Sequence, residues 1–124
     1  MADATQFIER DFINQLSQRL TQSSDWKIDA DSRSGDMVVQ DPRSGKRIFI
    51  EFQEGGQYGE LPISSVVSLN KQKNRLSGKD TLFLITFSAI SSLLAGKLKE
   101  LGIMAIARPS VDEVVGKLQF AMSA

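Results

Sequence analysis

The segment 81–87, TLFLITF, constrains the fold of this chain more than any other part of it, because it is almost continuously apolar. A strand with one solvated face alternates apolar and polar residues, whereas an unbroken apolar run is typical of a strand that is covered on both faces. Helices must then pack on both sides of the sheet that contains this strand. The segment therefore predicts an α/β fold.

The remaining elements follow from hydrophobic periodicity. Helical spacing of apolar residues predicts helices over 4–22, 63–76, 89–101 and 110–122. Alternating or short apolar runs predict strands over 26–30, 37–39, 47–53, 81–87 and 104–107. We expect the first three strands to form an antiparallel meander that leads into right-handed crossovers. The result is a mixed central sheet flanked by helices, in one domain over residues 1–124.

Local signals mark the ends of several elements. The Asp41–Gly45 segment, DPRSG, is typical of a hairpin turn. Ser88 is expected to cap the helix that follows the central strand, and Gly102 to end it. Ser110 and Glu113 have the spacing of a capping box, which predicts the start of the last helix.

Two residue types are missing, and their absence excludes whole classes of chemistry. The chain has no Cys and no His, which rules out zinc fingers, Cys nucleophiles and Ser-His-Asp triads. Lys plus Arg is 15 and Asp plus Glu is 15, so binding of nucleic acid by bulk charge is not expected. No apolar run approaches the roughly 20 residues that span a bilayer. The N-terminus lacks the character of a secretory signal, so we expect a cytoplasmic protein with no membrane partner.

Carboxylates in the second and third strands form the strongest candidate site. Residues two apart in a strand share a face, so Glu51 and Gln53 lie on one face while Ile50 and Phe52 face the core. The hairpin would bring Asp36 beside Glu51, and two carboxylates with a main-chain carbonyl suit Mg²⁺. Alternatively, Asp36 is only a turn residue, and Glu51 lies on an exposed face or pairs with a cation.

This pattern resembles the PD-(D/E)XK nuclease superfamily, which has the restriction-endonuclease-like fold. That family places an Asp at the start of one strand and (D/E)-x-K on the next, after an N-terminal helix. The α-β-β-β-α-β order over residues 4–88 is similar as well, followed here by a further α-β-α. The resemblance implies a DNA endonuclease that uses Mg²⁺ or Mn²⁺. Its metal ligands would be Asp36, Glu51 and the Phe52 carbonyl, with Glu9 of the first helix completing the acidic cluster.

One departure from the family pattern concerns the lysine. Gln53 stands where Lys is usual, and Gln can hydrogen-bond a water but supplies no positive charge. Some active restriction enzymes of the superfamily use E-x-Q, and others carry a lysine on the next helix. Lys73, in a stripe with Leu69 and Leu76, is the candidate for that role; alternatively, it is a solvated residue at the helix edge. Glu9 is equally open, since a helix-edge Glu can simply face water.

Basic residues suggest where DNA would bind. Lys71 and Arg75 lie on the helix after the motif, and Arg43 and Lys46 flank the hairpin turn; in the family's arrangement both groups adjoin the site and could hold phosphates. Such charges are also typical of a solvated surface. The competing function is a catalytically inactive domain of the same fold that serves as a DNA-binding or assembly subunit. Pairing of two copies, and membership of a larger protein complex, are both open.

Overall fold

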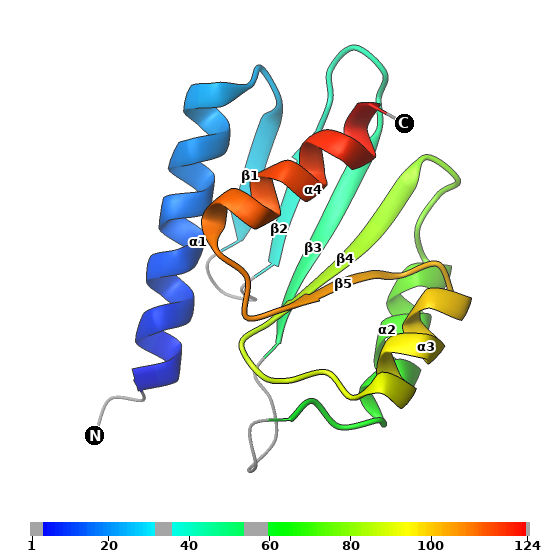
Figure 1. The fold of residues 1–124 in the computed structure, drawn as a ribbon. Helices are drawn as coiled ribbons and strands as arrows, with labels where there is room; N and C mark the ends of the chain where they lie inside the picture. Colours follow the sequence, from blue (N-terminus) through cyan, green and yellow to red (C-terminus); the bar gives the residue numbers. More distant parts are fainter. Residues whose placement is uncertain (1–3, 32–35, 54–59, 124) are drawn as a thin grey trace.

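The computed structural model describes residues 4–31, 36–53 and 60–123, with the side chains of 4–9, 30, 31 and 36 outside that description. Figure 1 shows a sheet with helices on both faces, which confirms the α/β class. In chain order the elements are α1 (Ala4–Ser23), β1 (Lys27–Asp31), β2 (Asp36–Gln40), β3 (Arg47–Gln53), α2 (Ser65–Asn74), β4 (Asp80–Thr86), α3 (Ser92–Glu100), β5 (Met104–Ala107) and α4 (Val111–Ser123).

The five strands form one mixed sheet in the order β1-β2-β3-β4-β5. β1, β2 and β3 pair antiparallel, whereas β3, β4 and β5 pair parallel. The expected meander leading into parallel strands is therefore present. The five residues from Leu82 to Thr86 in β4 are all buried, as the unbroken apolar run predicted for a strand covered on both faces.

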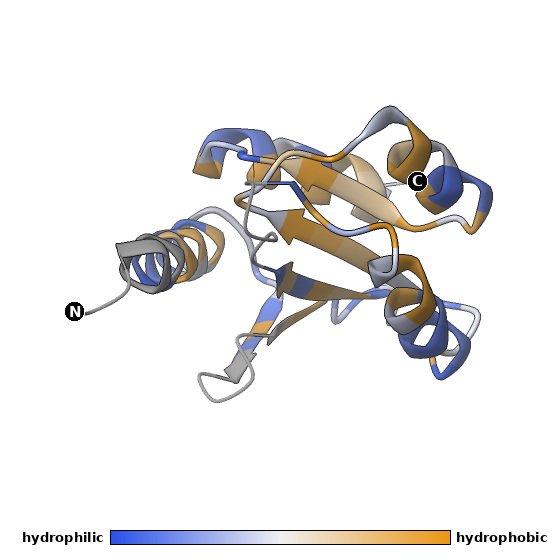
Figure 2. Cartoon of the chain, turned by 90° about the horizontal axis from the view of Figure 1, so that it is seen from below, coloured by the Kyte–Doolittle hydropathy of each residue, from blue (hydrophilic) through white to orange (hydrophobic). Residues whose placement is uncertain are grey.

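The sheet separates two apolar cores. The first lies between the sheet and helices α1 and α4, and it contains Leu16, Ile50 and Phe83. The second lies between the sheet and helices α2 and α3, and it contains Leu69 and Leu84. Figure 2 shows the apolar strands enclosed between these helices. No helix in the described part of the chain is long and apolar enough to cross a membrane.

The predicted capping box of α4 and the predicted glycine at the end of α3 are both confirmed. The Ser110 hydroxyl accepts a hydrogen bond from the Glu113 N–H at 3.1 Å, and the Ser110 N–H donates to Glu113 Oε1 at 3.1 Å. These two bonds form the capping box of α4. Gly102 has φ of +72°, a left-handed conformation that ends α3 and that favours glycine.

The expected cap at Ser88 is wrong, because the helix begins later. Ser91 caps α3, its hydroxyl accepting from the Leu94 N–H at 3.2 Å. Ser88 is buried instead, and its N–H donates to Thr86 Oγ1 at 3.1 Å. The chain stays non-helical after β4 because Ala89 pairs with Glu60 in a parallel bridge.

An ion pair joins the first residues of β3 and β4. Arg47 Nε and Nη2 donate to the two carboxylate oxygens of Asp80 at 2.9 and 2.8 Å, and the Ser77 N–H donates to Asp80 at 3.0 Å. The Arg47 guanidinium also lies 5.0 Å from the centre of the Phe49 ring. The Asp80 side chain is only 2% exposed, and the hydrogen bonds from Arg47 hold the pKa of its carboxyl below the ordinary value.

Asp80→Asn should lower the free energy of unfolding at neutral pH by about 1 kcal/mol, below the value for a fully buried pair because solvent screens Arg47. The Asp80 pKa is lower in the folded protein than in the unfolded chain, so its contribution is present above about pH 4 and is lost as pH falls further. The difference between wild type and variant should shrink at about pH 3. Urea titrations at both pH values measure it.

The matched control is Asp25→Asn, since Asp25 pairs with Arg43 at 3.1 Å but both side chains are largely exposed. This variant should unfold like the wild type. An equal effect of the two substitutions would contradict the structural role assigned to Asp80.

Candidate functional site

Glu51 and Gln53 lie on the face of β3 that α2 and α3 cover. The strand alternates half-buried and buried residues, with Ile50 and Phe52 buried in the core on the other face, as the sequence predicted. Glu51 pairs in register with Leu84 of the second core, and Gln53 pairs with Thr86. Register partners share a face. The C-terminal residues of β3 and β4 therefore carry polar groups beside an apolar core.

The register of β2 and β3 places Asp36 opposite Glu51 along the backbone. The last pair of this antiparallel ladder is Met37 with Ile50, and Asp36 and Glu51 are the next residue of each strand. Opposed residues in antiparallel sheets generally have Cβ atoms about 5 Å apart. The side chain of Asp36 lies outside the described residues. The two positions thus follow the last pair of the ladder at the same end of the hairpin, and their expected metal site stays a prediction.

Helix α1 approaches the sheet from the other side. Leu16 and Leu20 of α1 pack in the core that contains Ile50, not in the core that contains Leu84. The side chain of Glu9 lies outside the described residues, so its role as a ligand stays a prediction. Among the side chains that the structure describes, no three acidic residues gather into a metal-binding group.

Lys73 has a partner between two helices. Its ammonium group donates to the carbonyl oxygen of Leu101, at the C-terminus of α3, and lies close to Gly102. A cation at a helix C-terminus is favoured because the unpaired carbonyl groups there carry partial negative charge. This contact gives Lys73 a structural role in joining α2 to α3. Its catalytic role stays a prediction that the contact does not support.

The basic residues of the hairpin do not adjoin Glu51 and Gln53. Arg43 and Lys46 belong to the turn that precedes β3, so they lie at the opposite end of this strand from Gln53. In an antiparallel hairpin the turn joins the two strands at one end, and Gln53 is at the other end. The expected proximity of the turn residues to the site is therefore wrong. Arg43 pairs with Asp25. Lys71 and Arg75 are exposed at the end of α2.

Two features at the end of β4 were not anticipated. Thr86 is fully buried although it is polar, and it is the register partner of Gln53. Arg108 follows β5, and its N–H donates to the Thr86 carbonyl at 2.7 Å. Thr86 is the polar residue inside the second half of the apolar run, and its place there was a usable signal. Nothing local in the sequence indicated that Arg108 would lie at this end of the sheet.

Comparison with known proteins gives one structural likeness. No protein-family model matches the chain, and no curated protein matches it in sequence. A solved structure described as EndoMS in apo form aligns with a TM-score of 0.46 and 14% sequence identity, covering 78% of this chain and 47% of that one. This chain thus spans about half the length of that protein. A likeness of this extent establishes no shared activity.

Lys73→Met should lower the free energy of unfolding by about 1 kcal/mol, because the Leu101 carbonyl loses its donor while the apolar stem of the side chain is kept. Thermal or urea unfolding measures the loss. Lys71→Met, two residues earlier and exposed, is the matched control and should change little. Equal stability of the two variants would mean that the Lys73 contact does not hold α2 against α3.

Proposed function

We propose that the chain is a Mg²⁺-dependent DNA endonuclease whose metal site is formed by Asp36 and Glu51. The observation that carries this proposal is the placement of Glu51. It lies half-buried among apolar residues of β3, on a face covered by helices, and opposite the backbone position of Asp36. A carboxylate at this position, next to the Phe52 main-chain carbonyl, offers oxygen ligands at the end of β3 where the motif places the metal.

The donor atoms at this position suit a hard cation. Asp36, Glu51 and the Phe52 main-chain carbonyl offer oxygen ligands, which Mg²⁺ and Mn²⁺ prefer. The chain has neither His nor Cys, the nitrogen and sulfur ligands that zinc sites in proteins usually use. A bound Mg²⁺ would supply an activated water and offset the charge of the scissile phosphate.

The proposed reaction is the hydrolysis of a phosphodiester. The oxygen of water bonds to phosphorus, the bond from phosphorus to one sugar oxygen breaks, and that oxygen takes up a proton. The products are a phosphomonoester and a free hydroxyl group. Gln53, on the same face as Glu51, would orient the attacking water through its amide. It offers no positive charge to the developing phosphate charge, so the reaction should be slower than with lysine.

Gln53 also favours a second function. Two residues are candidates for the role of the family's lysine. Gln53 is neutral, and the ammonium group of Lys73 donates to the Leu101 carbonyl. The alternative is an inactive domain of this kind that binds DNA or serves as an assembly subunit. Metal and DNA binding without cleavage would favour it.

Glu51→Gln should abolish the binding of Mn²⁺ or Mg²⁺ in titration calorimetry, because the amide removes the charge that holds the cation. It should also reduce nicking of supercoiled plasmid by at least about 100-fold. Glu100→Gln, an exposed carboxylate at the end of α3, is the control and should leave both unchanged. A wild-type protein that binds no divalent cation would refute the nuclease proposal.

Gln53→Lys should raise the nicking rate by about 10- to 100-fold, since lysine adds a charge beside the scissile phosphate. The rate is measured on supercoiled plasmid with Mg²⁺ at several pH values. Gln53→Met, which is similar in length but cannot hydrogen-bond in the same way, should instead lower the rate. A Gln53→Lys variant that is folded and no faster than the wild type would show that this position does not act on the water.

A further inference from the structure

Arg108 is held at the end of the sheet where β3 and β4 finish. Its N–H donates to the Thr86 carbonyl at 2.7 Å, and its Nε donates to the Phe87 carbonyl at 3.2 Å. Phe87 is itself fixed, because its ring packs edge-on against Phe12 of α1 with centroids 5.4 Å apart. These contacts tie both the backbone and the side chain of Arg108 to the end of β4.

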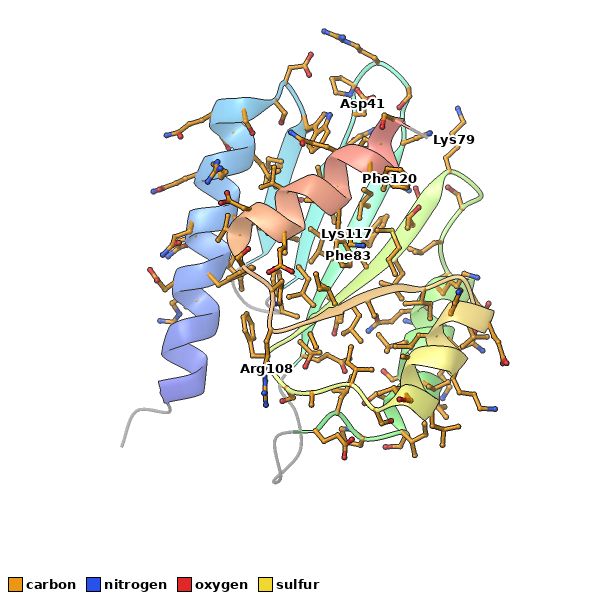
Figure 3. The ribbon with its side chains drawn as sticks, viewed as in Figure 1. Asp41, Lys79, Phe83, Arg108, Lys117 and Phe120 are labelled. Atoms are coloured by element: carbon orange, nitrogen blue, oxygen red, sulfur yellow. The ribbon has the colours of Figure 1, made fainter. Side chains whose placement is uncertain are left out.

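This position lies at the same end of the sheet as Gln53. Thr86 pairs with Gln53 in the β3–β4 ladder and with Ala107 in the β4–β5 ladder. Neighbouring strands stand about 4.8 Å apart, so the Arg108 backbone is roughly 10 Å from that of Gln53. Phosphates of one DNA strand recur every ~3.4 Å along the helix axis, so a few nucleotides span this separation. In Figure 3, Arg108 and Lys79 lie at opposite ends of the sheet.

The backbone of Arg108 is strained. Its φ of +49° is the one left-handed value among the non-glycine residues that the structure describes. That conformation costs an L-residue roughly 1 kcal/mol or more, and glycine would adopt it without the cost. Buried Pro109 and the capping box at Ser110 follow directly and hold the chain in this turn. A long cationic side chain is kept where the fold favours glycine, and strain of this kind gathers at functional sites.

The chemistry of the site calls for a cation at this end. A DNA backbone that approached Asp36 and Glu51 would bring its phosphates toward two carboxylates, and a cation at the same end of the sheet would favour that approach. The guanidinium of Arg108 is a planar fork of N–H donors that matches a phosphate, and the residue is exposed.

We infer that Arg108 binds a backbone phosphate of DNA beside the Glu51 site. This inference rests on the proposed function and names a residue that positions its substrate. It assigns the phosphate contact to the end of β5, away from the basic residues of the hairpin turn.

The test measures binding of a short fluorescein-labelled DNA duplex by anisotropy, with Ca²⁺ in place of Mg²⁺, from about 50 to 200 mM salt. Arg108→Asn removes the charge with a residue that tolerates left-handed φ, so the variant should fold. We expect binding to weaken about tenfold, and the slope of log affinity against log salt to fall by about one. Arg108→Lys should retain most of the affinity, and Lys79→Asn, at the other end of the sheet, should change neither quantity.

Two outcomes would overturn the inference separately from the proposed function. Wild-type affinity and salt slope in a folded Arg108→Asn protein would remove the phosphate contact while leaving the nuclease proposal in place. A lower melting temperature with unchanged binding would show that Arg108 only holds β5 against β4. A wild-type protein that does not bind the duplex would refute the proposed function itself, and the inference with it.

Discussion

The parallel pairing of β3 with β4 is the constraint on which the rest of this structure depends. The ladder runs from Arg47 with Asp80 to Gln53 with Thr86, and an ion pair joins the two residues of its first step. A slip by one residue would turn every side chain of β3 to the opposite face. Glu51 would then enter the core of α1 and α4, and the apolar residues of β3 would leave it. The same pairing therefore builds both cores and positions the candidate site.

The two ends of this ladder have different chemical characters. At its beginning, a buried carboxylate is matched by a guanidinium and a backbone N–H, so that end is electrostatically satisfied. At its finish, Glu51 and Gln53 stand beside fully buried Thr86, and the strained turn at Arg108 follows β5. Backbone strain of the kind found at Arg108 reduces stability and gathers at functional sites. The strained turn and the residues of the proposed site lie at the same end of the sheet.

The positive charge available at the end of β3 distinguishes the two proposed functions, which are cleavage of DNA and binding without cleavage. A phosphodiester needs cations around it, and the family that the motif resembles uses a metal and a lysine. Here the lysine position holds Gln53, and Lys73 donates to a carbonyl of α3. Arg108 is fixed two strands away from Gln53. Because of this separation, the proposal gives Arg108 the binding of a phosphate and not the activation of the water. The proposals therefore assign substrate binding and catalysis to different residues, so that a loss of one need not remove the other.

The sequence by itself determined what depends on local periodicity and local hydrogen bonds. The element types, the opposite faces of Glu51 and Ile50, the buried β4 and the capping box at Ser110 could all be predicted, because each follows from residues a few positions apart. Only the tertiary structure decided which distant groups meet. In the folded chain Lys73 contacts Leu101, and Arg108 lies at the end of β4. Ser91, and not the expected Ser88, caps α3. These contacts follow from strand order and helix packing, which no short pattern in the chain encodes.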